Sequence, residues 1–384
     1  MLINSLLDQD LYKLSMMSIA YHRFPLMKVK YKFVCRNKDI DLVPFINSIR
    51  TDIRNMCCFS FTNYDMYYLE SLGFFKPDFL NYLRNFKLDS MHVDIVNNNG
   101  IFELEINGTW LETILFEVPV LAIINENYFK GKILNHIEAR DRLEKKVELI
   151  KHLNDDKFKI VEFGTRRRAS GFWQDSVVKY LHEEIPNNFV GTSNIGLAQR
   201  YGVKAIGTMA HEYIQAFQAI VHPKHSQLEA FNVWSDEYRG DLGIALTDTI
   251  NMDNFLRIFD KSLAKLYDGL RHDSGNPCVW ARKAINHYKG LGIDPKTKSL
   301  VFSDNLNVQK AIDLYKEFNR EINVSFGIGT NLTNDCGEEA LNIVIKLIEF
   351  DGLSVAKISD QPSKGICSDE NYLKWLKSIF GVPQ

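Results

Sequence analysis

The sequence predicts an α/β protein, an irregular TIM-like α/β barrel plus a mixed α/β N-terminal domain. After about residue 157, short apolar segments recur, and each ends in small or polar residues before a helical stretch. Strands of this length alternating with helices are typical of parallel β/α units, and about seven or eight units suggest a barrel. The chain is also long enough for a large core, with 384 residues of which 45% are hydrophobic.

The region before residue 157 follows a different pattern. LLDQDLYKLSMMSIAYHRF predicts a helix, VKYKFVCR alternates like a strand, and MHVDIVNNNGIFELEINGTW predicts a hairpin with an Asn/Gly turn. Two short helices, broken at Gly73 and Pro77, are expected between the strand and the hairpin. Residues 130–153 are charged and helical and are suited to bridging two domains.

Composition narrows the class of protein. The net charge is −2 with no basic tail, so nucleic acid is not an expected partner. No apolar run approaches the length of a membrane span, and we expect no membrane partner. The six cysteines form no C-x-x-C pair, and no secretory signal precedes them, which favours reduced thiols in the cytoplasm. The adjacent Cys57 and Cys58 are taken as structural thiols.

The polar residues that follow the apolar segments are candidates for one site. In a barrel these positions gather at one rim, where catalytic residues lie. A rim rich in Arg, Asp and Gly suits phosphorylated ligands. The residues concerned are Arg166, Ser193, His211, Asp248, Arg271, Asp273, Asp304 and Gly329.

The stretch GTMAHEYIQAF places His211 near the start of a predicted amphipathic helix, with Thr208 as the expected N-cap. A helix N-terminus disfavours imidazolium and favours an anion, so a neutral ring there suits a nucleophile that accepts a phosphoryl group. Asp248, in LTDT, could fix its tautomer. From the helix alone a solvated surface histidine is the favoured alternative. Zinc is disfavoured because HEYIQ lacks the second histidine of H-E-x-x-H.

The loop FGIGT, 326 to 330, offers a phosphate cradle. Its backbone N–H groups, at Gly327, Gly329 and Thr330, could bind an anion, although glycines also make ordinary turns. The loop is neither a Walker A motif nor a G-x-G-x-x-G fingerprint, which disfavours an ordinary P-loop kinase.

Two charged motifs suggest substrate binding. In FGTRRR we expect Arg166 to bind a carboxylate or phosphate and Phe163 to offer a ring face; the alternative is a solvated charge run. In RHDSGNP, Arg271 would hold an anion and Asp273 would hold ribose hydroxyls or a metal, and Asp304 could bind a sugar hydroxyl. Each aspartate is, in the alternative, a cap or turn residue.

Taken together, these motifs resemble those of bacterial nicotinate phosphoribosyltransferases. The resemblance runs from SLLDQDLYKL at the start to VAKISDQPSKGIC near the end. The specific motifs occur in the family's order: FGTRRR, FVGTSN, IGTMAHE, LTDT, GLRHDSGNP, FSDNLN and FGIGTNLTND.

The resemblance implies that phosphoribosyl pyrophosphate and nicotinate give nicotinate mononucleotide, the entry of salvaged nicotinate into NAD synthesis. ATP hydrolysis would be coupled through a phosphohistidine at His211. Mg²⁺ would accompany phosphoribosyl pyrophosphate and ATP, with no dedicated protein metal site. The implied domains are residues 1–130, a catalytic barrel over 131–340, and a segment 341–384 packing back on the first domain.

By resemblance, Phe163 stacks on one side of the pyridine ring and Tyr12 of the partner subunit on the other, which implies a homodimer. For Tyr12 the alternative is a core aromatic residue. The other implied roles are nicotinate binding by Arg166, anion binding by Arg271, ribose binding by Asp273 and Asp304, and 5′-phosphate binding by Gly327, Gly329 and Thr330.

The residue at position 193 distinguishes enzymes that use nicotinate from related enzymes that use nicotinamide. The nicotinamide enzyme carries an acidic residue at this position, which accepts from an amide but repels a carboxylate. A neutral Ser193 therefore favours nicotinate. Three alternatives stay open: nicotinamide phosphoribosyltransferase, quinolinate phosphoribosyltransferase without the ATP-linked histidine, and a catalytically silent ligand-binding relative.

Overall fold

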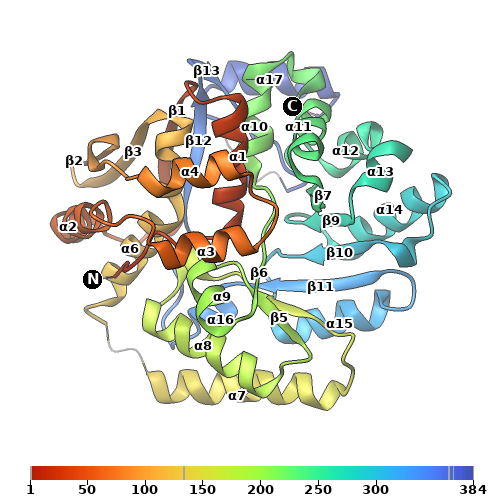
Figure 1. Cartoon of the computed structure of the whole chain (residues 1–384), viewed down its shortest axis with the longest axis horizontal. Coiled ribbons are helices and arrows are strands. Elements are labelled where there is room, and N and C mark those ends of the chain that lie inside the picture. The colour runs from red at the N-terminus through yellow and green to blue at the C-terminus, as the bar shows by residue number, and fades with distance from the viewer. Residues whose placement is uncertain (1, 133–134, 362–363, 366, 384) are drawn as a thin grey trace. The chain divides into compact units, whose positions relative to one another are not determined.

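The computed structural model describes residues 2–132, 135–361, 364–365 and 367–383 and has two compact units. The first comprises Met1–Gly207 with Ile328–Lys346, and the second Thr208–Gly327 with Leu347–Gln384. Figure 1 labels the elements of both. None of the helices described is long and apolar enough to cross a membrane.

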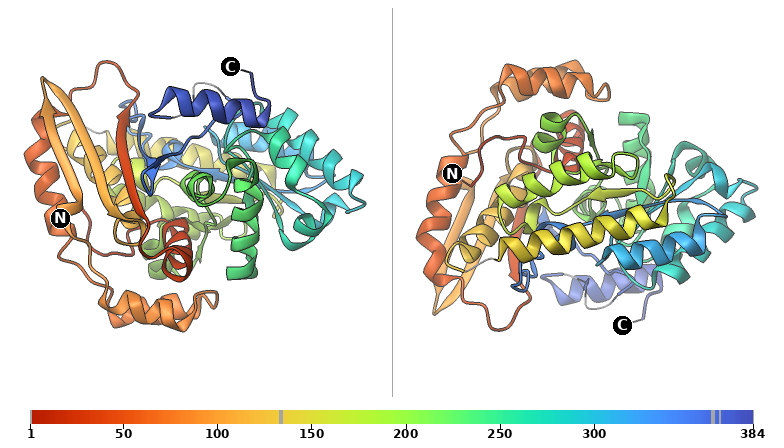
Figure 2. Two further views of the ribbon diagram at one scale, coloured as in Figure 1. Left: turned by 90° about the horizontal axis from the view of Figure 1, so that it is seen from above. Right: turned by 90° about the horizontal axis from the view of Figure 1, so that it is seen from below.

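The first unit contains the antiparallel strands in the order β1-β3-β2, with α2 against β2 (Figure 2). The hairpin forms as predicted: Val93 pairs with Ile106 and Asn98 with Ile101. Asn99 and Gly100, both at positive φ, make the turn. The elements up to α7 are α1 (Leu11–Arg23), β1 (Lys28–Cys35), η1 (Val43–Phe45), α2 (Ile46–Met56), α3 (Asn63–Ser71), α4 (Pro77–Asn85), η2 (Ser90–His92), β2 (Val93–Asn98), β3 (Ile101–Thr109), α5 (Trp110–Thr113), η3 (Ile114–Phe116), α6 (Glu117–Phe129) and α7 (His136–Leu153).

Parallel β/α units follow in the same unit. Strands lie in the order β4-β5-β6, and the register pairs Glu162 with Thr192 and Thr192 with Ala205. The residues that follow β4 and β5 therefore lie at one edge. The elements are β4 (Ile160–Glu162), η4 (Thr165–Arg167), α8 (Gly171–Glu184), β5 (Phe189–Thr192), α9 (Ile195–Tyr201), β6 (Lys204–Ala205) and α16 (Thr330–Thr333).

The second unit repeats this pattern with parallel strands in the order β8-β9-β10-β11. Its elements are α10 (His211–Ile220), α11 (Pro223–Tyr238), β7 (Arg239–Leu242), β8 (Ile244–Leu246), α12 (Met252–Ile258), α13 (Lys261–Leu266), β9 (Gly269–His272), α14 (Pro277–Gly290), η5 (Pro295–Thr297), β10 (Ser299–Phe302), α15 (Val308–Phe318), β11 (Asn323–Ile328), β13 (Leu353–Ser354) and α17 (Glu370–Phe380); β12 (Ile343–Phe350) carries the chain into it from the first unit.

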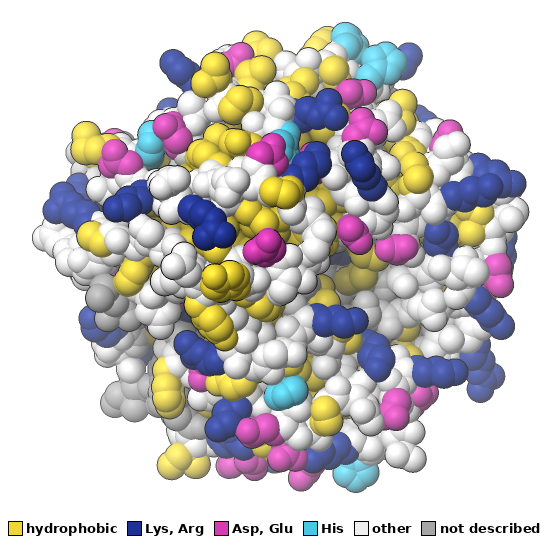
Figure 3. Space-filling view, in the orientation of Figure 1, with side chains coloured by type: hydrophobic (Ala, Val, Ile, Leu, Met, Phe, Trp, Pro, Cys, Tyr) yellow, Lys and Arg dark blue, Asp and Glu magenta, His cyan; other side chains and the backbone are white. Residues whose placement is uncertain are grey.

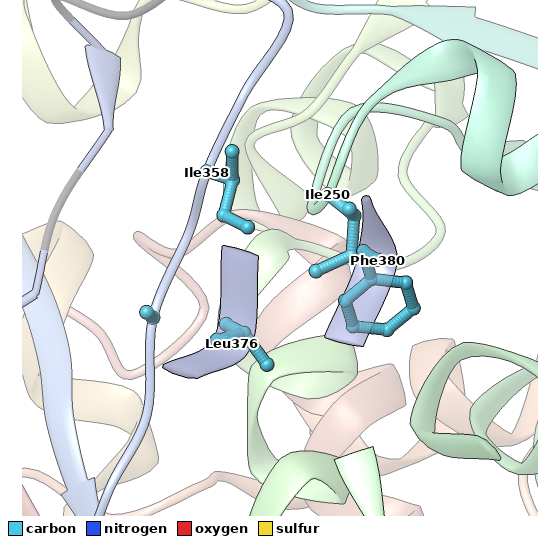
Figure 4. Close-up of a cluster of buried hydrophobic side chains, with 5 residues drawn as sticks. Ile250, Ile358, Leu376 and Phe380 are labelled. Carbon is cyan, nitrogen blue, oxygen red and sulfur yellow. The ribbon is translucent and has the colours of Figure 1, made fainter. Parts of the chain in front are cut away.

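A buried apolar cluster fixes the last part of the chain within the second unit (Figure 4). Ala356 and Ile358 pack with Ile250 and with Leu376 and Phe380 of α17. The Gln218 amide holds this segment as well, because its Nε2 donates to Ala356 O and its Oε1 accepts from Ala356 N. Residue 357, between two anchored neighbours, is thereby held in place.

The α/β prediction is confirmed in both units, since helices alternate with parallel strands after the hairpin region. The predicted domain boundaries stay a prediction. On the face drawn in Figure 3, basic and acidic side chains are interspersed.

Candidate active site

The strand register of the second unit brings the predicted polar residues to one edge. Leu246 pairs with Arg271, His272 with Phe302, and Phe302 with Phe326. The next positions along the chain therefore share that edge. They are Asp248 after β8, Asp273 after β9 and Asp304 after β10; Gly327 is the last residue but one of β11.

His211 is the first residue of α10, and its side chain is 19% exposed. Its Nε2 lies 2.7 Å from Asp248 Oδ1. The solvated surface alternative is therefore wrong. The predicted cap is also wrong: the N-cap is Ala210, with no side-chain cap, and Thr208 Oγ1 instead donates to Ile244 O at 2.9 Å.

Asp248 is 1% exposed and accepts from three groups. Its Oδ2 lies 2.8 Å from Lys357 Nζ and accepts from Ser274 Oγ at 2.5 Å, while Oδ1 faces His211. Burial alone would raise the pKa of Asp248, but His211 and Lys357 hold that pKa well below its usual range. Asp248 is thus a permanent carboxylate.

This carboxylate sets the tautomer of His211. An ionised Asp248 accepts only, so Nε2 carries the proton and Nδ1 carries the lone pair. Burial lowers the pKa of His211, and the nearby Lys357 ammonium lowers it further, while Asp248 opposes both. The ring is therefore neutral and oriented at neutral pH, at a helix N-terminus that favours added negative charge.

Lys357 and Ser274 were missed as site residues by sequence reasoning. Both lie inside quoted motifs, VAKISDQPSKGIC and GLRHDSGNP, but a lysine or serine in such a loop has no periodicity that marks it as buried. Ser359 Oγ donates to Ser274 Oγ at 2.9 Å and extends the network.

Asp273 and Asp304 lie beside this network. Asp273 Oδ2 is 3.8 Å from His211 Nε2, and its Oδ1 accepts from Ser303 Oγ at 3.2 Å. Lys364, also missed, donates to Asp273 O at 3.0 Å and forms an ion pair with Asp304. Arg271, in β9, has a buried Nε with no hydrogen-bond partner among the residues that the structure describes.

His211, Asp248 and Asp273 could each offer one atom to a metal ion, and these atoms lie within 4.8 Å of one another. The donors do not suit a resident Mg²⁺, which prefers oxygen ligands, because both Asp248 oxygens already accept from Lys357, Ser274 and His211.

In the first unit, two of the predicted pyridine-binding residues contact acidic side chains: Ser193 contacts Asp10, and Arg166 contacts Glu117. Ser193, after β5, is buried, and its Oγ donates to Asp10 Oδ1 at 2.7 Å. Burial raises the pKa of Asp10, although Ser193, Thr165 and Arg166 act in the opposite direction. Asp10 was not singled out from the sequence, where it reads as one acid in DQDLYKL.

The arginines of FGTRRR separate into different roles. Arg166, in η4, is 38% exposed, with Nη1 3.6 Å from Glu117 Oε1. Arg168 is buried and binds Asp8 and Glu126, so it belongs to the core. This partition supports the choice of Arg166 as the ligand-facing arginine.

Tyr12 is the second residue of α1 and is half-buried, with the buried Lys13 ammonium 5.7 Å from its ring centroid. Lys13 in turn pairs with Glu117 at 2.5 Å. Phe163 follows β4, and its N donates to Ile328 O at 2.9 Å.

The remaining loop residues are placed near the start of α16. Gly329 precedes that helix and Thr330 begins it. A Cβ on Gly329 would lie 3.2 Å from Phe163 O, so the close approach of the two loops explains the glycine. Phosphate binding by Gly327, Gly329 and Thr330 stays a prediction.

Parallel β/α units that end in an oriented neutral histidine, a buried carboxylate and an arginine define an α/β enzyme acting on phosphorylated substrates. The chain belongs to the nicotinate phosphoribosyltransferase family. Sequence models of this family match residues 158–384, and models of its N-terminal domain match residues 7–125.

Individual relatives agree over the full length. Nicotinate phosphoribosyltransferases of Acidovorax sp. (strain JS42) and Ralstonia pickettii (strain 12J) are each 46% identical over 100% of this chain and 99% and 100% of their own lengths. Solved structures of nicotinate phosphoribosyltransferases superpose with TM-scores of 0.95: that of Vibrio cholerae is 38% identical and covers 100% of this chain and 94% of its own, and that of Porphyromonas gingivalis is 34% identical and covers 99% and 100%. The predicted family is confirmed, and the alternative functions are not favoured.

Proposed function

We propose that this protein is a nicotinate phosphoribosyltransferase: it transfers the phosphoribosyl group of phosphoribosyl pyrophosphate to nicotinate and couples the transfer to ATP hydrolysis through phosphorylation of His211. The observation that carries the coupling is the 2.7 Å contact between His211 Nε2 and a buried Asp248 that also binds Lys357 and Ser274. Full-length similarity to the family supports the transfer, and we propose the cytoplasm as its place.

The phosphorylation step follows from the tautomer. The Nδ1 lone pair forms a bond to the γ-phosphorus of ATP while the bond to the bridging oxygen breaks and ADP leaves with that electron pair. The proton on Nε2 stays on the ring, held toward Asp248. Water then cleaves the N–P bond and restores the neutral imidazole with release of phosphate.

Phosphorylation changes the charge of the site, and this change is the means of coupling. The added phosphoryl group would lie at the N-terminus of α10, whose first residue is His211 and whose dipole favours negative charge. Coupling of about 3 kcal/mol between phosphorylation and substrate affinity corresponds to about a hundredfold. Hydrolysis would then weaken binding and release product.

The transfer step requires an aimed pyridine nitrogen and an activated leaving group. Phe163, and Tyr12 from the partner subunit of a homodimer, would stack on the ring, while Arg166 would bind the nicotinate carboxylate. Arg271, Asp273 and Asp304 would hold the phosphoribosyl moiety. Mg²⁺ bound to the pyrophosphate would neutralise its departing charge.

The test combines purified protein with nicotinate, phosphoribosyl pyrophosphate and Mg²⁺, with and without ATP, and measures nicotinate mononucleotide. We expect ATP to stimulate the wild-type protein and His211→Ala to retain slow, ATP-independent transfer without stimulation. Equal loss of both activities in His211→Ala, with an unchanged melting temperature, would contradict a role restricted to coupling.

A further inference from the structure

Glu162, the last residue of β4, is a fully buried carboxylate with no assigned role in the transfer. It directly precedes Phe163 and lies beside the loop that carries Ser193, because Ser193 N donates to Glu162 O at 2.9 Å. Its backbone therefore adjoins the residues that we propose bind the pyridine ring, and its side chain is buried.

The side chain collects donors from three segments. Oε2 accepts from Thr192 Oγ1 at 2.5 Å and from Gln174 Nε2 at 2.9 Å, and Oε1 accepts from Gly164 N. Thr192 belongs to β5, Gln174 to α8, and Gly164 to the loop before η4. One carboxylate thus joins the loop that carries Phe163 and Arg166 to the loop that carries Ser193.

The donors to Glu162 lie in closely packed backbone or make further hydrogen bonds of their own. A Cβ on Gly164 would lie 2.0 Å from Thr333 Oγ1, which shows how closely that backbone is packed. Gln174 Nε2 also donates to Thr165 Oγ1 at 3.0 Å, and Thr192 Oγ1 also accepts from Asn194 N at 3.0 Å. All of Glu162's donors are thereby oriented before substrate arrives.

We infer that Glu162 is a positioning residue for nicotinate: through its three acceptor contacts it fixes the loop 163–168 against the loop 192–194, and so sets the separation of Phe163, Arg166 and Ser193. This inference rests on the proposed function and names the group that organises its pyridine subsite. Glu162 itself touches no substrate in this account.

The ionised form performs this task. Its neighbours are donors, so a proton on either oxygen would face an N–H or O–H group. Burial raises the pKa of Glu162 to about 7, and the nearby Asp10 also raises it. The hydrogen bonds from Thr192, Gln174 and Gly164 lower this pKa but do not offset burial. The other charged groups of this region are Arg166, Glu117 and Lys13 near Asp10, and Arg168, whose Nη1 donates to Gln174 Oε1.

The test is Glu162→Gln, which keeps the shape but must turn one amide donor toward Thr192 and Gln174 or toward Gly164. We expect the KM for nicotinate to rise about tenfold or more, as for a buried donor left without an acceptor. Phosphorylation of His211 by ATP should proceed at the wild-type rate. In the wild type the KM for nicotinate should rise as the pH falls through about 7, and in the variant it should lack that step.

Asp65→Asn is the matched control, because Asp65 is a buried carboxylate of the first unit that caps α3 and accepts from Thr62 N at 2.8 Å. It should lower the melting temperature without changing the KM for nicotinate or its pH profile. The inference is overturned if Glu162→Gln keeps the wild-type KM and pH step, or if it behaves as Asp65→Asn does. A protein that never forms nicotinate mononucleotide would contradict the proposed function instead.

Discussion

Asp248 and Glu162 are both fully enclosed carboxylates at the ends of parallel strands, yet their ionisation differs. Asp248 lies 2.8 Å from the Lys357 ammonium, and its pKa is well below the usual range. Glu162 accepts from neutral donors, and its pKa is raised to about 7. Hydrogen bonds alone do not offset the cost of burying the charge, whereas a buried cation does.

The difference matches the two tasks we propose. A carboxylate that orients a nucleophilic histidine must stay charged at every working pH, which Lys357 ensures. A carboxylate that organises a substrate loop and titrates near neutrality performs its task only in the ionised fraction, so binding of nicotinate should depend on pH. Changes at Lys357, at Ser193 and at Glu162 test whether the two carboxylates differ in this way.

The largest effect on stability is expected for Lys357→Met, which leaves Asp248, like Glu162, without a cationic partner lysine. Removing one partner of a buried ion pair costs about 3–5 kcal/mol of stability. The pKa of Asp248 should rise, because burial is then opposed by His211 and the Ser274 hydroxyl without the lysine ammonium. Chemical denaturation measures the first effect, and the pH dependence of His211 phosphorylation by ATP measures the second.

Lys357→Arg is the control, since it keeps the charge. Should Lys357→Met phosphorylate with the wild-type pH dependence and unfold at the wild-type denaturant concentration, Asp248 does not depend on a buried cation, and the comparison fails.

A smaller effect is expected for Ser193→Asp, which places a third carboxylate beside Asp10 and Glu162. Like charges at this distance disfavour binding of the nicotinate carboxylate, so kcat/KM for nicotinate should fall about tenfold relative to that for nicotinamide. Ser193→Asn, neutral and of similar size, separates charge from volume. An unchanged ratio in the aspartate variant would refute electrostatic discrimination at this position.

The smallest effect concerns how the free energy of unfolding depends on pH. The pKa of Glu162 is higher in the folded chain than in the unfolded chain, so its contribution is present at low pH and is lost as the pH rises through about 7. Between pH 6 and pH 8 the wild type should lose about 1 kcal/mol of unfolding free energy relative to Glu162→Gln. Denaturation curves of both proteins at the two pH values provide the measurement. If the wild type changes by the same amount as Glu162→Gln, or in the opposite direction, the pKa of Glu162 lies outside this pH range.

Much of this fold is predictable from local pattern. The hairpin follows from alternation around Asn99 and Gly100, and the end of α3 and start of α4 follow from Gly73 and Pro77. The β/α rhythm predicts which residues share an edge, because register places Asp248, Asp273 and Asp304 after neighbouring strands.

The partners of those residues are not predictable in the same way. Thr208 has the chemistry of an N-cap but donates to Ile244, and Lys357 reaches Asp248 because Ala356 and Ile358 are anchored by a cluster that includes α17. FGTRRR does not reveal that Arg168 is the core arginine, since its partners Asp8 and Glu126 lie far away in sequence. Such contacts depend on tertiary packing, which local sequence does not encode.

The most direct test of the account is to incubate the protein with γ-phosphate-labelled ATP during turnover, quench in alkali and map the label. A neutral His211 with its Nε2 proton held by Asp248 predicts an acid-labile label on His211 that is absent from His211→Ala. Turnover without label on His211, or label on another residue, would contradict it.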